Sequence, residues 1–342
     1  MDREPLTYAK AGVDVEAGDR AVALMRASVE ATHGPNVLGG IGGFAGLWRL
    51  AGDLGRAGLP SDPVLAAASD GVGTKLLIAQ ALDRHDTVGV DLVAMVVDDV
   101  VVCGAEPLFV LDYLAVGRVD PDRVAAIVAG VAEGCRRARC ALLGGETAEH
   151  PGAMAPDAYD LAGFALGMVE RDRVLGPDRV VPGDVLLGLA SSGLHSNGFS
   201  LARQVLTRAG IGYDRDLPEL GIPVGEALLT PTRIYAPHLI DLVTAGIEVH
   251  ALCHITGGGL RGNLPRSLPP GLTARVDRSS WEPPPIFQVL ADLGPVEDEE
   301  LARATNLGVG MVVILPAAEA DRAAELLASR KVKAWVMGEV VG

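Results

Sequence analysis

The sequence has few aromatic side chains and few basic ones, and both shortages limit what the protein can be. Phe, Trp and Tyr together make up 4% of its 342 residues, so the core must be built from Ala, Val, Leu and Ile. Lys and Arg number 29 against 44 Asp and Glu, which gives a formal charge of −15. Because no run of Lys and Arg offsets this charge, we expect no nucleic-acid-binding surface and no anionic-membrane surface.

Cysteine is also scarce, and long apolar segments are missing. The four cysteines have no CxxC spacing, so we expect buried, reduced thiols rather than disulfides. They are Cys103, Cys135, Cys140 and Cys253. The longest charge-free runs contain Ser, His, Asn and Gly and would not span a bilayer. The sequence begins MDREPLTYAK, without the apolar stretch of a signal peptide, and we therefore expect a cytoplasmic protein.

Glycine and proline, by contrast, are abundant, at 43 and 22 residues, which predicts many tight turns and some backbone sites for ligands. Hydrophobic residues at 49% and charged residues at 21% are typical of a globular protein. The length is sufficient for two domains with separate cores. The charged segment 170–178 interrupts the apolar periodicity and contains Gly-Pro, so we place a boundary near residue 170, between domains at 1–170 and 171–342.

Hydrophobic periodicity predicts an α/β protein. Apolar residues recur at helical spacing behind Asp120-Pro121, a pair typical of a helix N-terminus. Bulky apolar runs at 108–116 and 140–143 flank this helix, which indicates strand, helix, strand. Further strands are expected at 64–68, 161–169 and 185–190, and further helices at 76–82, at 92–103, after Asn197 and after Pro231. The Pro-rich segment 265–285 is expected to be a long surface loop.

Two glycine-rich segments of the first half have the composition of phosphate-binding loops. In GGIGGF, residues 39–44, four glycines in five positions let backbone N–H groups face one concavity; a flexible loop is the alternative. SDGVGTK, residues 69–75, follows a predicted strand and lacks the P-loop spacing GxxxxGK[ST]. Its Asp70 can bind Mg²⁺ and its Lys75 can neutralise phosphate oxygens. The alternative is a solvated Lys75 in the first turn of a helix.

Carboxylates in apolar surroundings are a second signal. Asp98 and Asp99 lie among valines, where burying two carboxylates is costly unless a cation such as Mg²⁺ is bound. Neighbouring helical residues lie about 100° apart around the helix axis, so only one of the two should face the site. The alternative is that no metal is bound, with one carboxylate solvated and the other capping a helix. GGETAE, residues 144–149, is expected just past a strand end, where its glycines bring the backbone close to a ligand near Glu146. An exposed Glu in a turn is the alternative there.

Two segments of the second half combine hydroxyls, an imidazole and glycines ahead of a possible helix start, which is an anion-binding composition. They are SSGLHSNG at 191–198 and HITGGG at 254–259. Because His195 and Ser196 are adjacent and no GxSxG motif is present, a serine-hydrolase triad is not expected. A zinc site would need a fourth ligand that the sequence does not offer beside its three candidates. Those candidates are His250, Cys253 and His254.

In this order, the segments resemble the phosphoribosylformylglycinamidine cyclo-ligase family, also called aminoimidazole ribonucleotide synthetase, of purine biosynthesis. The resemblance covers nearly the whole chain. Its motifs are YAKAGVD at 8–14, GGIGGF, SDGVGTK, RHDTVGVDLVAM at 84–95, GAEPLF at 104–109, GGETAEHPG at 144–152, SSGLHSNG, PTRIY at 231–235, HITGGG and LGVGM at 307–311.

The resemblance implies a fold, an assembly and a reaction. The fold would be the two-domain α/β subunit of an ATP-binding superfamily, forming a homodimer in which the N-terminal domains pair strands. The active site would lie in a cleft between the domains, at the dimer contact. The enzyme would use ATP to close formylglycinamidine ribonucleotide into aminoimidazole ribonucleotide, releasing ADP and phosphate, through phosphorylation of the formyl oxygen.

The resemblance also implies ligands for Mg²⁺, ATP and substrate. Asp70 and Asp99 would bind Mg²⁺, and Glu146, His195 and His254 would be catalytic. ATP and its phosphates would contact Gly39, Gly40, Gly42, Gly43, Phe44, Gly71, Gly73, Thr74 and Lys75. The substrate would contact Ser192, Gly193, His195, Ser196, Asn197, Thr256, Gly257 and Gly258.

This sequence departs from the family pattern at two places. The family commonly has Asn-Asp where this chain has Asp98-Asp99, which adds a carboxylate near the metal and could change the demand for divalent ions. The first motif of the family often reads Tyr-Lys-Asp-Ala-Gly-Val, whereas residues 8–13 of this chain read YAKAGV. The lysine is therefore at a different position in the motif, and a nucleotide-binding role cannot be transferred to Lys10. Ring closure should survive both changes.

Other members of the superfamily give competing hypotheses for the function. Thiamine-monophosphate kinase is the strongest, but GGETAEHPG and SSGLHSNG favour the cyclo-ligase. Selenide water dikinase would have a reactive Cys near the N-terminus, and formylglycinamidine synthetase would need a glutaminase. A hydrogenase maturation protein shares the architecture. A catalytically silent nucleotide-binding module would have damaged ATP motifs, whereas Asp70, Lys75, Asp99 and Glu146 are all present.

Overall fold

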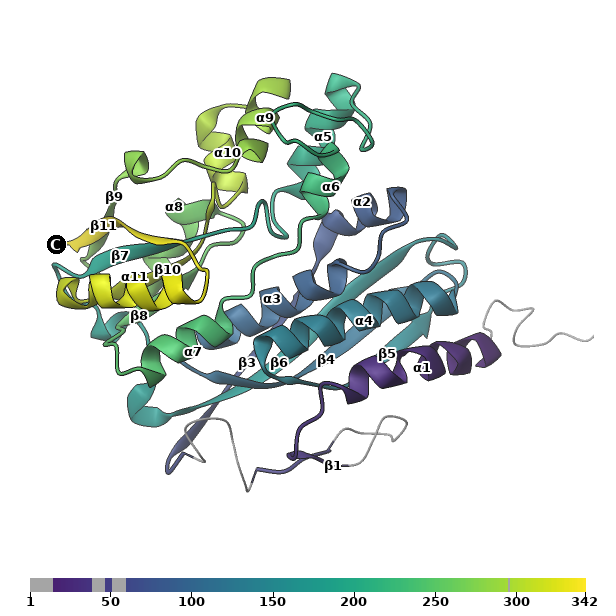
Figure 1. The fold of residues 1–342 in the computed structure, drawn as a ribbon, viewed down its shortest axis with the longest axis horizontal. Coiled ribbons are helices and arrows are strands. Elements are labelled where there is room, and N and C mark those ends of the chain that lie inside the picture. Colours follow the sequence, from purple (N-terminus) through teal and green to yellow (C-terminus); the bar gives the residue numbers. More distant parts are fainter. Residues whose placement is uncertain (1–14, 39–46, 51–59, 295) are drawn as a thin grey trace, which may run out of the picture.

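Two β-sheets dominate the computed structural model, which describes residues 15–38, 47–50, 60–294 and 296–342. The first sheet has strand order β3-β6-β4-β5 and the second has order β8-β10-β7-β11-β9, as Figure 1 shows. Two short strands, β1 (Val37–Leu38) and β2 (Leu47–Trp48), form a separate pair. Helices cover both sheets, so the predicted α/β class is confirmed.

The first sheet contains the longest strands of the described chain. Its strands are β3 (Pro63–Gly71), β6 (Tyr159–Glu170), β4 (Glu106–Val116) and β5 (Ala141–Glu149). Strand β6 pairs antiparallel with both β3 and β4, whereas β4 and β5 are parallel. Parallel neighbours need a crossover connection, and α4 (Pro121–Ala138) supplies it. The predicted strand, helix, strand unit is therefore confirmed.

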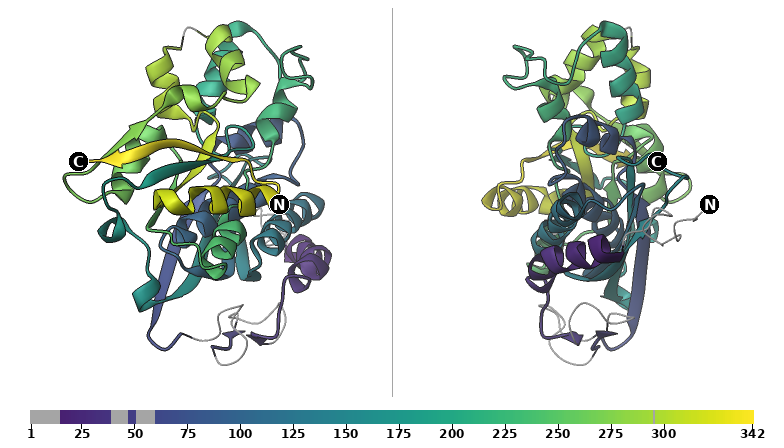
Figure 2. Two further views of the ribbon diagram at one scale, coloured as in Figure 1. Left: turned by 60° about the vertical axis from the view of Figure 1, so that its left-hand side comes forward. Right: turned by 90° about the vertical axis from the view of Figure 1, so that its right-hand side faces the viewer.

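Three helices cover one face of this sheet, as both views in Figure 2 show. They are α1 (Val15–Glu30), α3 (Val88–Val101) and α4. Helix α4 begins where the sequence predicts, because the Asp120 side chain accepts hydrogen bonds from the backbone N–H groups of Asp122 and Arg123. The other face of the sheet exposes the large apolar side chains Leu65, Tyr113 and Phe164.

The second sheet is antiparallel at each pairing of its strands. They are β7 (Val185–Ala190), β8 (Ala251–His254), β9 (Thr273–Val276), β10 (Val309–Leu315) and β11 (Ala334–Val341). Strand β10 lies inside the sheet and is buried along its whole length. Strand β9 forms one edge, within the segment expected to be a loop, so that expectation is wrong for these four residues.

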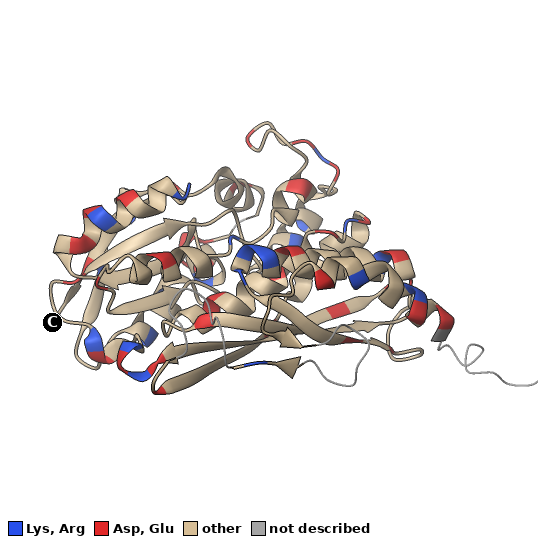
Figure 3. Cartoon of the chain, turned by 60° about the horizontal axis from the view of Figure 1, so that its bottom comes forward, with Lys and Arg blue, Asp and Glu red and all other residues tan. Residues whose placement is uncertain are grey.

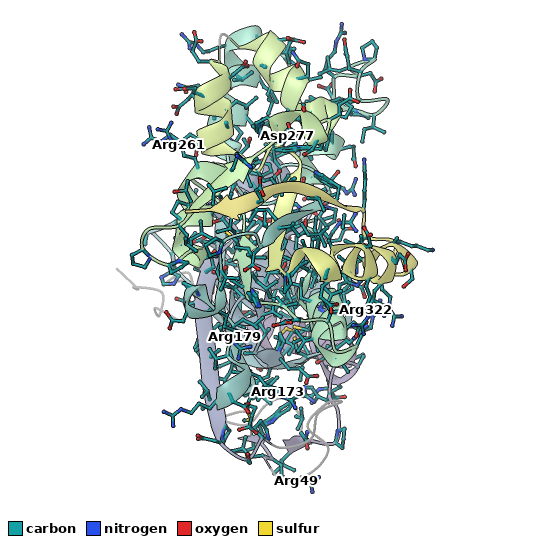
Figure 4. All side chains as sticks on the ribbon, turned by 90° about the vertical axis from the view of Figure 1, so that its left-hand side faces the viewer. Arg49, Arg173, Arg179, Arg261, Asp277 and Arg322 are labelled. Carbon is teal, nitrogen blue, oxygen red and sulfur yellow. The ribbon has the colours of Figure 1, made fainter. Side chains whose placement is uncertain are left out.

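Eight further α-helices connect strands within the described residues. They are α2 (Leu76–Ala81), α5 (Phe199–Ala209), α6 (Val224–Leu229), α7 (Ala236–Thr244), α8 (Gly259–Asn263), α9 (Pro285–Leu293), α10 (Asp298–Ala304) and α11 (Ala320–Ser329). Arg322 of α11, labelled in Figure 4, donates hydrogen bonds to the carbonyls of Ala245 and Gly246 just after α7. No helix among the described residues is long and apolar enough to cross a membrane.

One buried apolar cluster contains residues from both sides of position 170. It includes Val97 of α3 and Leu189 of β7. A second buried cluster covers the other face of the second sheet and includes Val312 and Met337. All four cysteines are free thiols, and three of them are buried, which confirms the prediction of reduced cysteines.

The first sheet also corrects one expectation about GGETAE. Strand β5 does not end at Leu143 but continues to Glu149, so Glu146 lies inside the strand and not past its end. The side chain of Asp112 explains the glycine in this strand, because a Cβ on Gly145 would lie 1.8 Å from Asp112 Oδ1. Gly145 makes room for a neighbouring strand's carboxyl group, and the glycines do not end the strand.

Candidate functional site

Segments that are far apart in the sequence meet where the two halves of the chain contact each other. The hydroxyl oxygens of Thr74 and Ser200 lie 3.1 Å apart, which joins the SDGVGTK segment to the start of α5. The Asn197 side chain accepts a hydrogen bond of 3.0 Å from the backbone N–H of Gly257. The structure thus brings together SDGVGTK, SSGLHSNG and HITGGG, as the sequence motifs suggested.

A pair of carboxylates and an imidazole lie at the centre of this region. Asp70 is near the end of β3, Asp99 is on α3 and His254 ends β8. His254 Nδ1 lies 2.8 Å from Asp99 Oδ1. Burial raises the pKa of Asp70, a hydrogen bond from Gly71 N–H opposes this, and the charge of Asp99 adds to the rise. The two carboxylates therefore repel each other, and a cation between them would relieve that repulsion.

The two ring nitrogens of His254 differ: Nδ1 is hydrogen-bonded to Asp99, and Nε2 has no hydrogen-bond partner. Burial alone would lower the pKa of His254, but the hydrogen bond to Asp99 and the charges of Asp98, Asp99 and Asp70 outweigh it and raise the pKa. The Nε2 atom is buried and has no hydrogen-bond partner. Because buried polar atoms are nearly always paired, Nε2 is the atom of this ring that a bound ligand could use.

These residues fit a magnesium ion only when a bound nucleotide or water supplies the rest of its coordination shell. Within the described part of the chain, no three His, Cys, Asp or Glu side chains are grouped so as to hold a metal by themselves. Mg²⁺ commonly takes one or two carboxylates and completes its shell with water and nucleotide phosphates. Asp70 and Asp99 supply that donor set.

The disfavoured zinc reading has no support in the structure. The His250 ring is bound by Asp184 at 2.7 Å and by Glu248 at 3.2 Å, and Cys253 is buried. Both His250 nitrogens therefore already have carboxylate partners, and the Cys253 thiol lies in the core.

The adjacent residues Asp98 and Asp99 have different surroundings, as their helical spacing predicts. Asp98 is fully buried and accepts hydrogen bonds from the backbone N–H groups of Tyr235 and Ala236, at 2.9 and 2.8 Å. Burial raises the pKa of Asp98 to about 7. The Asp99 side chain is 43% exposed beside His254. Only Asp99 is therefore placed to meet a ligand.

Lys75 is fully buried, which excludes the alternative of a solvated lysine. Its ammonium group donates to Asp91 Oδ1 at 2.8 Å and to the carbonyl oxygens of His195 and Thr230, at 3.1 and 2.8 Å. Burial lowers the pKa of Lys75 and the Asp91 charge opposes this. Sequence reasoning missed Asp91, whose signal was a lone acidic residue inside the apolar run GVDLVAM.

His195 is held inside its own loop. Its backbone has a φ of 64°, in the left-handed region, and its Nε2 accepts a hydrogen bond of 3.1 Å from Ser192 N–H. Burial lowers the pKa of His195 well below its usual value, and the charges of His254 and Lys75 add to this, so the ring is neutral. Nδ1 then bears the proton, and it is buried without a partner.

The loop 191–198 has internal supports that the motifs did not reveal. The Asn306 side chain donates to the carbonyls of Gly193 and Leu194, and Ser191 Oγ also contacts Asn306. Ser196 Oγ lies 3.1 Å from Thr232 Oγ1. Helix α5, which follows the loop, has no side-chain cap at its N-terminus, so its first N–H groups remain available to an anion.

Glu146 does not join this group within one chain. Strand β5 lies at the opposite edge of the first sheet from β3, and Glu146 is in register with Tyr113, which is exposed. The Tyr113 hydroxyl lies 3.1 Å from His150 Nε2. Figure 3 shows that the strands of this sheet are mostly uncharged. The GGIGGF residues Gly39, Gly40, Gly42, Gly43 and Phe44, and also Lys10, lie outside the described residues.

Two cavities lie largely outside the meeting loops. One, of about 1060 Å³, is in the second half, and Gly258, Arg261 and Arg303 are among its lining residues. The other, of about 600 Å³, is lined by residues of both halves, including Arg173 and Arg179; Figure 4 labels these two and Arg261. Of the predicted site residues, only Gly258 lines either cavity.

Comparison with known proteins gives consistent family matches. Residues 52–169 match the model for the AIR synthase related protein, N-terminal domain, and residues 181–342 match the model for the C-terminal domain. The phosphoribosylformylglycinamidine cyclo-ligase of Sorangium cellulosum is 55% identical over 338 residues, covering 98% of this chain and 95% of that protein. The Geotalea uraniireducens protein of the same name is 48% identical, covering 99% and 96%.

Solved structures with low sequence identity have the same fold. Thiamine-monophosphate kinase from Stenotrophomonas maltophilia superposes with a TM-score of 0.66 at 20% identity, covering 94% of this chain and 93% of that one. The hydrogenase maturation protein HypE in complex with ATP gives a TM-score of 0.62 at 19% identity, covering 95% and 86%. At this level of identity the likeness concerns the fold alone.

Proposed function

The chain belongs to the phosphoribosylformylglycinamidine cyclo-ligase family, and we propose that it closes formylglycinamidine ribonucleotide into aminoimidazole ribonucleotide, with ATP converted to ADP and phosphate. The observation that carries the proposal is the meeting of SDGVGTK, SSGLHSNG and HITGGG around Asp70, Asp99 and His254. The match over nearly the full length of named cyclo-ligases supports it.

The proposed chemistry begins with activation of the formyl group. An amide oxygen is a poor leaving group, so the formyl oxygen first attacks the γ-phosphorus of ATP and ADP leaves. The amidine nitrogen then attacks the activated carbon, and phosphate departs with the former formyl oxygen as the imidazole ring closes. The phosphoryl transfer needs cationic stabilisation of its oxygens.

Asp70 and Asp99 would bind Mg²⁺ in this proposal, and the ion would neutralise charge on the phosphate oxygens of bound ATP. Gly71, Gly73 and Thr74 would contact ATP, together with the GGIGGF segment. The α5 N-terminus and its loop would bind the phosphate group of the ribonucleotide. The substrate contacts would be Ser192, Gly193, His195, Ser196, Asn197, Thr256, Gly257 and Gly258.

The two histidines receive different roles. His254 Nε2 is the unpaired ring atom beside the carboxylates, and Asp99 orients the ring through Nδ1, so we assign His254 to proton transfer. His195 is neutral and its Nε2 is engaged by Ser192, so it would bind substrate through Nδ1–H.

We also propose that the protein is a homodimer and that its first sheet forms the contact. The exposed apolar side chains Leu65, Tyr113 and Phe164 on one sheet face support this assembly. Glu146 is in register with Tyr113, so in such a dimer it would act near the contact between subunits. We place the boundary between an N-terminal ATP-binding domain and a C-terminal domain near residue 170, between the two sheets.

The test is an assay with Mg²⁺, ATP and formylglycinamidine ribonucleotide, in which ADP and aminoimidazole ribonucleotide are followed together. Equal, substrate-dependent formation of both products is expected. A parallel reaction with thiamine monophosphate tests for thiamine-monophosphate kinase activity. Phosphorylation of thiamine monophosphate, with no imidazole product in the first reaction, would overturn the proposal. Asp70→Asn should abolish Mg²⁺-dependent turnover in a folded protein, and full activity of that variant would refute the metal assignment.

A further inference from the structure

We infer that the buried Lys75–Asp91 pair is a positioning device that holds two loops of the second half against α3 of the first, and that Lys75 is not a contact for ATP phosphates. The inference deepens the proposed function and rests on it for its catalytic consequence. The two loops are 191–198 and 230–236.

The donors of Lys75 are all in use. An ammonium group has three N–H donors and no acceptor, and Lys75 has three acceptors at 2.8, 3.1 and 2.8 Å. One acceptor is Asp91 of α3, and the other two are the backbone carbonyls of His195 and Thr230. Contacting a phosphate would therefore break at least one of these bonds. It would also require a side chain with no exposed surface to leave the core.

The choice of residue type supports this role. The chain has only four lysines among its 29 basic residues, namely Lys10, Lys75, Lys331 and Lys333. Arginine is the usual choice for forked contacts with carboxylates and phosphates, whereas an ammonium is a compact group with three rotatable donors. One carboxylate and two carbonyls around a small buried space match the ammonium group better than a planar guanidinium.

Asp91 extends the contact along the second loop. Its Oδ1 also accepts hydrogen bonds from Thr232, at 2.7 Å from the backbone N–H and 2.6 Å from the hydroxyl. Asp98 lies seven residues further along α3 and so on the same helical face, where it accepts from the N–H groups of Tyr235 and Ala236. Two carboxylates of one helix thus fix the segment 230–236 in register.

This arrangement determines the relative position of the two sides of the proposed site. Helix α3 also bears Asp99, which contacts His254. The Lys75 bond to the His195 carbonyl places loop 191–198 relative to the same helix. If Lys75 is removed, the buried Asp91 carboxylate loses its counter-charge and the loops lose a shared anchor. The phosphate-binding loop should then move with respect to Asp70 and Asp99.

The first test is chemical acylation of lysines in the native, full-length protein, with and without Mg²⁺ and ATP, read by mass spectrometry. Lys331 and Lys333 are exposed and serve as internal controls that should react quickly. Lys75 should remain unmodified in both conditions. Rapid acylation of Lys75 that ATP suppresses would overturn the inference, because it would show an ammonium group open to solvent and covered by nucleotide. This test does not depend on the cyclo-ligase activity.

The second test is a double-variant comparison of Lys75→Met, Asp91→Asn and the two combined, with Lys333→Met as the matched control. Lys75→Met should lower kcat by about 100-fold, as small displacements of catalytic groups do, with the KM for ATP changed by less than about twofold. Amide hydrogen exchange should rise in 191–198 and 230–236. The combined variant, which no longer buries a lone carboxylate, should recover part of the lost kcat and protection.

A phosphate-contact role predicts different results. The KM for ATP would then rise in Lys75→Met, exchange in the two loops would be unchanged, and Asp91→Asn would not rescue it. If Lys75→Met does not fold, the acylation result still decides between the roles. If the wild-type protein forms no aminoimidazole ribonucleotide, the proposed function fails, whereas the exchange and acylation results still judge the positioning role.

Discussion

His254 Nδ1 and Asp99 Oδ1 lie 2.8 Å apart, and this contact joins the end of β8 to α3 across the boundary between the two halves. The neighbouring Asp98 is turned into the core and binds the backbone of Tyr235 and Ala236. Two adjacent carboxylates therefore have separate surroundings: Asp99 is partly exposed beside His254, and Asp98 is buried against the backbone of the second half.

The first prediction uses this pair as a matched comparison. Asp99→Asn should reduce kcat/KM by 100-fold or more, about 3 kcal/mol, because it removes the proposed metal ligand and the charged partner of His254. Asp98→Asn should retain turnover and the same Mg²⁺ dependence, since an amide oxygen can still accept from the two N–H groups. Steady-state kinetics over a range of Mg²⁺ concentrations measures both. An Asp98→Asn variant with an altered Mg²⁺ requirement would contradict this assignment.

Gly310 on β10 lies under two side chains of the site. A Cβ at this position would lie 2.1 Å from the Tyr235 hydroxyl and 2.4 Å from His195 Cε1. Gly310→Ala should therefore displace His195, lower kcat and destabilise the protein by about 1–3 kcal/mol. Gly262→Ala is the control, because nothing lies within 4 Å of its Cβ and alanine favours the helix. Urea unfolding and turnover assays check both variants, and equal behaviour of the two would refute the prediction.

The open face of the first sheet should control assembly. Leu65 and Phe164 are 57% and 36% exposed there. Changing both to Asp places charges on an apolar contact, so the double variant should be monomeric at concentrations where the wild type is dimeric. Light scattering after size-exclusion chromatography gives the masses. Leu77→Asp, at a 40% exposed position on α2, should leave the dimer intact; a wild-type monomer would refute the proposed dimer.

Stability should depend on pH through Asp112. Burial raises the pKa of Asp112 to about 7, whereas an unfolded Asp has a pKa of about 3.9. The folded state therefore keeps a proton that unfolding releases, so this contribution to stability is complete below about pH 4 and is lost as the pH rises to about 7. Asp112→Asn should remove roughly 3 kcal/mol of the stability difference between pH 5 and pH 8.

Urea unfolding at both pH values measures this effect in the wild type and the variant. Asp321→Asn, at an exposed position on α11, is the control and should follow the wild type. Identical pH dependence in Asp112→Asn and wild type would show that Asp112 is charged in the folded protein.

Local signals predicted some elements well and others poorly, for physical reasons. Helix α4 has a capping Asp120, a following proline and a clear apolar stripe, all within one segment, so the sequence alone locates it. Strand β9 has four residues at a sheet edge and depends on pairing with β11, more than 60 positions later. Strand β5 likewise continues through two glycines because it pairs with β4, and Gly145 in it leaves room for Asp112 of that neighbouring strand. Such long-range partners leave no local pattern.

The same distinction applies to the site. Asp70, Asp99 and His254 could be predicted because each belongs to a compact motif with an evident ligand chemistry. Asp91 and Asn306 could not, because their roles are defined by partners outside the motifs in which they lie. Asp91 is bound by Lys75, 16 positions earlier, and Asn306 donates to the Gly193 carbonyl, 113 positions earlier. The placement of Glu146 on the far edge of the sheet also required the strand order.

The hydrogen bonds between α3 and segment 230–236 have a consequence for folding during synthesis on the ribosome. Asp98 receives its hydrogen bond from Ala236 N–H only when a residue 138 positions later is available. A ribosome that adds roughly 10 residues per second would leave the buried Asp98 without these partners for roughly 10 s. The core around Asp98 is therefore completed only after segment 230–236 is made, and a fragment that stops near residue 170 should be less stable and more prone to aggregate than the full chain.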